Sequence, residues 1–112
     1  MKEKHANLLD VMPCVGKRIS TGQEGELSVI TFPRFRNKFM QKYLVPKHKS
    51  PFIHIRLEKH GTAVWNLIDG RRTVRDIAVA LETHFDGEKD YEYRIMAFLE
   101  QLRRQGFIKY LT

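Results

Sequence analysis

The sequence predicts an α+β, winged-helix-like fold with an N-terminal three-stranded antiparallel sheet, a three-helix bundle and a short C-terminal strand. Three observations lead to this class. Alternating or β-branched runs stand before residue 58, helical repeats of apolar residues stand after it, and turns rich in Gly and Pro separate them. Strands followed by helices and a last strand are typical of α+β domains. With 112 residues and 42% hydrophobic content, the chain can form one core. We therefore expect one domain over residues 1–112.

The N-terminal 35 residues predict a short helical turn and a hairpin. Asn7 is a capping residue before the apolar cluster that ends with Met12, and Pro13 then ends the turn. Two strands, Lys17–Ser20 and Glu26–Phe32, are expected on either side of the turn sequence TGQEG. Residues 1–35 are thus an N-terminal extension and hairpin.

The segment Phe52–Leu57, FIHIRL, is the clearest strand because apolar and polar residues alternate along it. Alternation places every second side chain on the same face of a sheet. We expect core-facing side chains at Ile53, Ile55 and Leu57, and outward-facing side chains at Phe52, His54 and Arg56.

Three helices are expected after this strand, over Glu58–Ile68, from Thr73 to Phe85, and over about Asp90–Gln105. Asp69-Gly70 ends the first, and Thr73 with Asp76 forms a capping box for the second. Their predicted buried faces are Gly61, Val64, Trp65 and Ile68 in the first, Val74, Ile77, Ala78, Leu81 and Phe85 in the second, and Tyr91, Ile95, Phe98, Leu99 and Leu102 in the third. After Gly106 at the helix end, Phe107–Leu111 forms the closing strand.

The positive charge is concentrated in one segment. The chain has a net charge of +7, and Pro33–Lys59 contains eight Lys or Arg and a single acid, Glu58. Within it, residues 36–51 are an insert whose apolar stripe predicts a short basic amphipathic helix, formed by Phe39, Met40, Tyr43 and Leu44. This helix either docks on the rest of the chain or meets an acidic partner or membrane surface. Residues 52–112 remain as the core of the domain.

Catalysis and metal binding find no support in the residue pattern. The five histidines lack ligand spacing, and there is no nucleophile elbow, phosphate-binding glycine loop or carboxylate pair, so we expect no enzyme, no metal and no cofactor. The lone Cys14 is expected to pack as a small apolar residue. No apolar run is long enough to span a bilayer or to serve as a secretion signal, so we expect a cytoplasmic location.

The stretch WNLIDGRRTVRDIA reads as a helix-turn-helix, so DNA binding is a real alternative. A winged-helix transcriptional regulator would use Arg71, Arg72, Arg75, Arg103 and Arg104. However, the basic segment lies before this motif, and Glu92 and Glu100 on the third helix would face phosphates. We therefore consider nucleic acid an improbable partner.

A peptide fits the remaining features better. If Phe52–Leu57 lies at a sheet edge, an extended peptide can add to it as a further strand. The basic segment favours an acidic ligand. We expect the strand contacts to be Phe52, His54 and Arg56, and the helix contacts to be Tyr93, Met96, Glu100 and Arg103. The same edge can pair with a second copy of the chain, giving a homodimer, and a structural adaptor for a larger enzyme is a third possibility.

The run HIRLEKHGTAVWNLIDGRRTVRDIAVALETHF, followed by YRIMAFLEQLRRQGFI, resembles the PqqD family, the RiPP recognition elements. Members carry the pattern xLNxxGxxIWxLxDGxxTVxEIxxxL and then a helix ending in FLxxLxxxGLI. The matching residues are Leu57, Gly61, Trp65, Leu67, Asp69, Gly70, Thr73, Val74, Ile77, Leu81, Phe98, Leu99, Leu102, Gly106 and Ile108. Two features depart from the family pattern. The N-terminal residues and the basic insert are longer than the family core requires. Glu58 and Lys59 stand at positions where members often have Asn or Asp, and Glu.

This resemblance implies a non-catalytic domain of three strands and three helices. Such domains bind the leader of a precursor peptide between the third strand and third helix and present it to a modifying enzyme. For PqqD itself that enzyme is a radical SAM protein in pyrroloquinoline quinone (PQQ) synthesis. By position, the third strand is Phe52–Leu57 and the third helix is about Asp90–Gln105.

Overall fold

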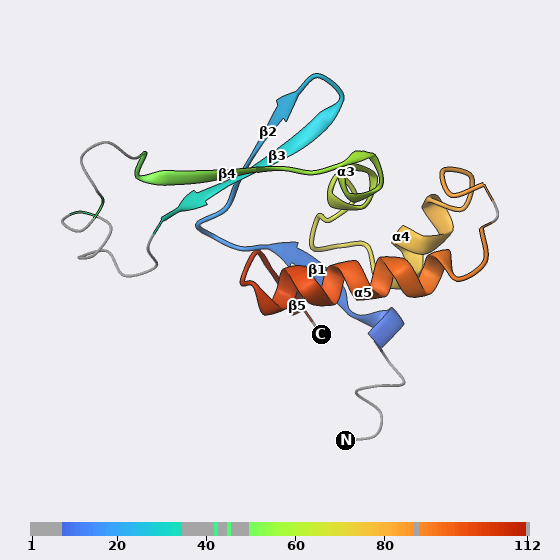
Figure 1. Ribbon diagram of the computed structural model, residues 1–112. Helices are drawn as coiled ribbons and strands as arrows, with labels where there is room; N and C mark the ends of the chain where they lie inside the picture. The colour runs from blue at the N-terminus through green and yellow to red at the C-terminus, as the bar shows by residue number, and fades with distance from the viewer. Residues whose placement is uncertain (1–7, 35–41, 43–44, 46–49, 87, 112) are drawn as a thin grey trace. The chain divides into compact units, whose positions relative to one another are not determined.

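The computed structural model describes residues 8–34, 42, 45, 50–86 and 88–111 (Figure 1). It confirms the α+β class, with a three-stranded antiparallel sheet, three helices and a C-terminal strand. The chain divides into two compact units, one formed by Lys17–Lys59 and the other by Met1–Gly16 together with His60–Thr112. We call them the sheet unit and the helical unit.

The sheet unit contains β2 (Ser20–Glu24), β3 (Leu27–Pro33) and β4 (Phe52–Arg56), in the order β2-β3-β4. Both pairings are antiparallel. The central strand β3 is the most buried, and the side chain of Ile30 is 0% exposed. The strand predicted at residues 52–57 is therefore confirmed, and it lies at one side of the described sheet.

The hairpin between β2 and β3 is shifted along the sequence from its predicted position. The predicted strand Lys17–Ser20 was wrong, because Lys17 and Arg18 form a turn and β2 uses most of TGQEG. The connecting turn is only Gly25-Glu26, and Gly25 has φ +64°. Glycine adopts this conformation easily at the first position of a two-residue hairpin turn. The strand pairing therefore places the turn at the second glycine of TGQEG.

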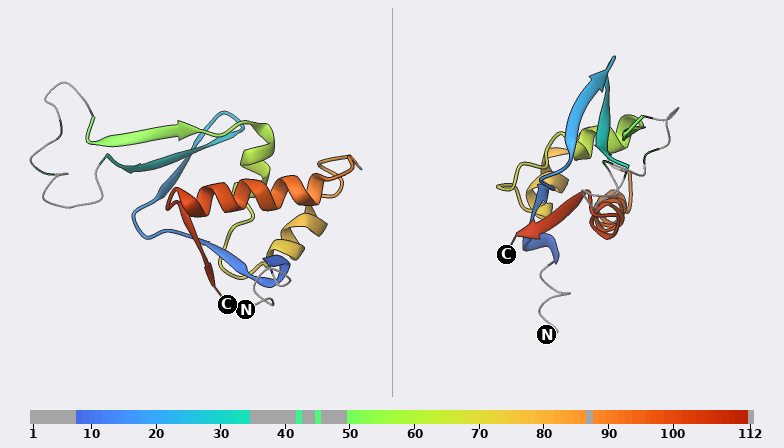
Figure 2. Two further views of the ribbon diagram at one scale, coloured as in Figure 1. Left: turned by 60° about the horizontal axis from the view of Figure 1, so that its bottom comes forward. Right: turned by 90° about the vertical axis from the view of Figure 1, so that its left-hand side faces the viewer.

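The first described elements of the helical unit are a 3-10 turn, η1 (Leu8–Asp10), and the strand β1 (Met12–Val15). β1 pairs antiparallel with the last strand, β5 (Ile108–Leu111), so these two strands lie side by side although they come from opposite parts of the chain (Figure 2). The expectation of a helical turn up to Met12 was correct only for η1, and the strand β1 was missed. Pro13 lies within β1 opposite Tyr110. Proline is tolerated in such a strand where no further strand needs its N–H.

Three helices, α3 (Lys59–Trp65), α4 (Val74–Ala80) and α5 (Tyr91–Arg104), supply most of the core of this unit (Figure 1). The predicted periodicities are largely confirmed. The buried apolar residues of the helices and the segments that follow them are Val64, Trp65, Ile68, Val74, Ile77, Ala78, Leu81, Phe85, Ile95, Leu99, Leu102 and Phe107. Tyr91 and Phe98 are half-buried and do not belong to the fully buried set.

The turn before α4 has the left-handed glycine that the sequence predicted, together with polar contacts that it did not predict. Gly70 has φ +77°, and its N–H donates to the Pro13 carbonyl at 2.9 Å. The Asp69 carboxylate accepts from the backbone N–H groups of Arg72 and Arg71, each at 2.8 Å. These hydrogen bonds lower the pKa of Asp69. The turn is therefore held by two hydrogen bonds to its own Asp69 carboxylate and by one hydrogen bond to Pro13 of β1.

The capping box of α4 makes a testable contribution to stability. The Asp76 N–H donates to the Thr73 hydroxyl and the Thr73 N–H donates to the Asp76 carboxylate, both at 3.0 Å. Thr73→Ala is expected to lower the free energy of unfolding by about 1 kcal/mol, because a backbone donor loses its partner. Urea denaturation checks this, with Thr73→Ser as the control that retains the hydroxyl. A change in the serine variant as large as in the alanine variant would contradict the capping role.

The predicted basic amphipathic helix lies outside the described residues, as do its stripe residues Phe39, Met40, Tyr43 and Leu44. The predicted capping residue Asn7 also lies outside them.

Candidate functional site

The outer edge of β4 offers unpaired backbone groups. The Leu57 N–H donates to the Ser28 carbonyl and the Arg34 N–H donates to the Pro51 carbonyl, both at 2.9 Å. In an antiparallel ladder the backbone groups of alternate residues point to the same side. The odd-numbered residues of β4 therefore bond to β3, and the N–H and C=O groups of His54 and Arg56 point away from it. No other described strand pairs with this edge.

The two polar side chains of β4 are already engaged within the sheet. His54 Nδ1 lies 2.8 Å from the Thr31 hydroxyl on β3. Arg56 reaches Glu24 on β2 with a 2.5 Å ion pair. The N–H of Phe52 donates to the Ser50 hydroxyl at 3.1 Å, and Phe52 is 46% exposed. The predicted outward orientation of these three residues agrees with their exposure.

The prediction for the opposite face of β4 was partly wrong. Leu57 is buried and Ile53 is half-buried, but Ile55 is 37% exposed. Its partner Ile30 on β3 is fully buried. The apolar face of the sheet thus becomes exposed toward its outer strand, because no described strand continues the sheet beyond Ile55. Alternation in the sequence cannot predict the exposure of Ile55. It predicts the face on which a side chain lies, but not whether its strand is central or at the edge of the sheet.

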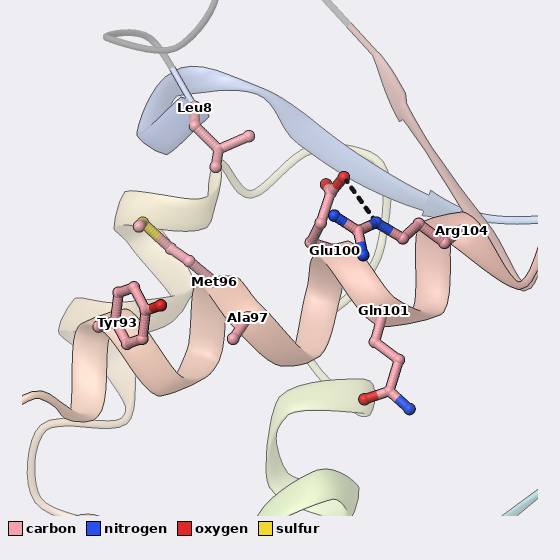
Figure 3. Close-up of a pocket in the computed structure, with 7 residues that line it drawn as sticks. All are labelled: Leu8, Tyr93, Met96, Ala97, Glu100, Gln101 and Arg104. Atoms are coloured by element: carbon pink, nitrogen blue, oxygen red, sulfur yellow. Dashed lines mark ion pairs between the residues drawn. The ribbon is translucent and has the colours of Figure 1, made fainter.

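A separate surface lies within the helical unit, where one face of α5 and Leu8 of η1 line an open groove of about 450 Å³ (Figure 3). Tyr93, Ala97 and Gln101 follow one line along α5, as their spacing of four residues dictates. The full lining is Leu8, Tyr93, Met96, Ala97, Glu100, Gln101 and Arg104. Three of the four predicted helix contacts, Tyr93, Met96 and Glu100, therefore come together here.

The fourth predicted helix contact, Arg103, does not line this groove. Its guanidinium donates to the Glu100 carboxylate and lies over the Tyr110 ring, 5.6 Å from the ring centroid. Arg104 lines the groove instead, and its side chain lies 3.6 Å from Glu100. The helical spacing from Tyr93 to Ala97 and Gln101 could have identified the rest of this surface. The contribution of Leu8 to the groove could not be predicted from the sequence, because Leu8 is distant from α5 along the chain and lies near it only in the folded structure.

Glu100 is the centre of this charge cluster. The hydrogen bond from Arg103 is the largest cause that lowers the pKa of Glu100 to about 2, and the Tyr110 hydroxyl, at 3.0 Å, also donates to it. Burial raises the pKa of Tyr110 to about 12, and its hydrogen bond to the Glu100 carboxylate acts in the same direction. The ionised carboxylate thus joins α5 to β5.

The lowered pKa of Glu100 predicts a loss of stability in acid. The charged form stabilises the folded state above the ordinary pKa of 4.5, and this contribution disappears as the pH falls toward 2. We expect a loss of only about 1 kcal/mol, because the cluster is partly exposed and screened by solvent. Urea denaturation at several pH values should show this loss in the wild-type chain and not in Glu100→Gln. Parallel pH profiles for the two chains would contradict it.

The arginines proposed for DNA contact are mostly paired. Arg72 pairs with Asp69 at 3.0 Å and Arg75 pairs with Asp10 at 3.1 Å. Arg103 and Arg104 share Glu100, which leaves Arg71 as the member of this set with no ion pair to a described residue. Each paired carboxylate neutralises an arginine charge that would otherwise be available to a DNA phosphate. The structure therefore weakens the alternative of a DNA-reading surface.

A histidine pair was missed by sequence reasoning. His60 Nδ1 and His84 Nε2 lie 2.9 Å apart, and the His60 ring stacks on Phe85 at 4.9 Å. The two histidines are 24 residues apart, and no spacing rule connects them. Within the described residues, no group of three or more His, Cys, Asp or Glu is placed to hold a metal ion. Among the same residues, no helix has the length and apolar character needed to cross a membrane.

Comparison with known proteins identifies the family. Neither the curated proteins nor the solved structures compared with the chain gave a match. The family model described as Coenzyme PQQ synthesis protein D (PqqD) matches residues 53–108, which is half of the chain. This range runs from β4 through the three helices to the first residue of β5. The chain therefore belongs to the PqqD family.

Proposed function

We propose that this chain is a non-catalytic peptide-binding domain that recognises the leader of a precursor peptide by strand addition to β4. It then presents that peptide to a modifying enzyme such as a radical SAM protein. Membership of the PqqD family supports an accessory, peptide-binding role associated with PQQ synthesis in general. The observation that carries the proposal is the outer edge of β4, where the backbone groups of His54 and Arg56 point away from β3.

The alternation of these backbone groups supports recognition by strand addition. Two residues of β4 offer N–H and C=O groups on the same side, and an extended peptide can bond to both of them. Strand addition gives affinity through the main chain, so it suits a ligand whose side chains differ from one precursor to another.

We propose that α5 supplies a second contact surface through Tyr93, Met96, Glu100 and Arg103. Tyr93 is the best anchor of this set, since the residue is 68% exposed and an exposed aromatic side chain can bury a large area on binding. Tyr93→Ala is expected to lower peptide affinity roughly fivefold to tenfold. Glu92→Ala, at the neighbouring exposed position, should leave affinity unchanged. Equal affinities for both variants and the wild type would remove α5 from the site.

Selection from a displayed library of random peptides tests the proposed function. We expect the full chain to select peptides that bind it in solution, and a labelled DNA duplex to bind weakly with an affinity that falls steeply with salt. Fluorescence anisotropy measures both on the same protein. Tight duplex binding together with failure to select any peptide would favour the regulator alternative and overturn the proposal.

A further inference from the structure

We infer that the strand added to β4 is apolar at the residue opposite Ile55 and is not selected for acidic side chains at the two residues flanking it. This inference rests on the proposed function and concerns which peptides the site accepts. It differs from the expectation of an acidic ligand, which followed from the basic segment Pro33–Lys59.

The cationic side chain of β4 is turned away from the site where the ligand would lie. Arg56 is opposite Val29 on β3, and Val29 is opposite Gly22 on β2. The Arg56 guanidinium passes over β3 to Glu24 on β2, while Gly22 has no side chain to block its path. The side chain therefore points across the sheet and away from the outer edge of β4.

An acidic peptide gains little from this arginine. The Arg56 and Glu24 side chains are 62% and 61% exposed, and such exposed pairs contribute little free energy. A peptide carboxylate that paired with Arg56 would displace Glu24 and return that carboxylate to water. One ion pair is exchanged for another, so the charge of Arg56 does not select acidic ligands. His54 is likewise held by Thr31 on the neighbouring strand.

The apolar preference follows from the pairing geometry. The backbone N–H and C=O groups of His54 and Arg56 would form the hydrogen bonds to an antiparallel peptide. Ile55 would therefore face the peptide at a non-hydrogen-bonded pair. Side chains of opposite residues approach most closely at such positions. Ile55 and its partner Ile30 on β3 lie on the same face of the sheet. Ile30 is fully buried, whereas Ile55 is 37% exposed. An aliphatic or aromatic peptide side chain opposite Ile55 would extend this apolar face by one more strand.

Parallel selections from a displayed library of random peptides test the inference. The wild-type chain is compared with Glu24→Gln, which releases Arg56, and with Glu26→Gln, which removes the same charge from the adjacent turn. The selected peptides are aligned on the apolar residue that lies opposite Ile55. This residue is identified as the one that contributes to affinity for the wild-type chain but not for the Ile55→Thr variant. We expect the wild-type and Glu26→Gln pools to lack acidic enrichment at the two flanking positions. The Glu24→Gln pool should be enriched severalfold in Asp or Glu at one of them.

The results separate this inference from the proposed function. Acidic enrichment at the flanking positions in the wild-type pool would overturn the inference. Pools from Glu24→Gln and Glu26→Gln that cannot be distinguished would also overturn it. So would peptide affinities that do not change in Ile55→Thr. In these cases the selected peptides still lose affinity when proline replaces His54, so strand addition survives. If the selected peptides are insensitive to that proline, strand addition to β4 itself is wrong.

Discussion

Replacing His54 with proline is expected to lower the affinity for a selected peptide by at least about tenfold. The His54 N–H points away from β3, so the protein loses no hydrogen bond of its own ladder. The peptide carbonyl that accepts from this N–H would be left without a donor. An unsatisfied buried acceptor costs about 1–3 kcal/mol, and about 1.4 kcal/mol corresponds to a tenfold change in affinity.

His54→Ala is the matched control for this change. Both variants lose the imidazole and its contact with Thr31, but alanine retains the backbone N–H. We expect the alanine variant to bind within about twofold of the wild type, and the denaturation midpoints of the two variants show whether the sheet is intact. Calorimetric titration gives the affinities. Equal losses in both variants would assign the effect to the imidazole and not to the backbone.

Leu99→Ala is expected to lower the free energy of unfolding by about 3 kcal/mol. Leu99 lies in the middle of α5 and is 0% exposed, so truncation leaves a cavity in the core of the helical unit. A domain of this size has a total stability of only about 5–15 kcal/mol, which makes such a loss large.

Equilibrium urea denaturation measures this loss. Gln101→Ala, two residues further along the same helix and exposed, should change stability by less than about 0.5 kcal/mol. A loss below about 1 kcal/mol in Leu99→Ala would show that Leu99 is not part of a well-packed core.

The helices could be predicted from the sequence because their signals are local. The period of apolar residues located all three helices, and Thr73 with Asp76 located the start of α4. Their buried faces are set by a single helical repeat, so no distant residue is needed to predict them.

The strands depended on partners that the sequence does not name. β1 forms because Met12–Val15 meets Ile108–Leu111, nearly a hundred residues later, and its Pro13 argued against a strand. The hairpin turn was misplaced because TGQEG contains two glycines, and only pairing with β3 decides which one forms the turn. Local patterns cannot choose between such alternatives.

For the candidate site, the sequence predicted which residues point outward but not what they touch. Alternation along Phe52–Leu57 placed His54 and Arg56 on the exposed face. Their partners Thr31 and Glu24 lie on other strands, so no local pattern could indicate these contacts. The sequence shows that Arg56 carries a charge, but not that this charge is already paired within the sheet.

Strand addition to β4 is tested most directly by nuclear Overhauser contacts in the complex of the chain with a selected peptide. Strand addition predicts contacts between peptide backbone protons and the amide protons of His54 and Arg56, with slowed hydrogen exchange at those two amides on binding. It predicts no such change at β2, the other outer strand of the described sheet. Peptide contacts confined to β2 or to the helical unit, with unchanged exchange at His54 and Arg56, would contradict it.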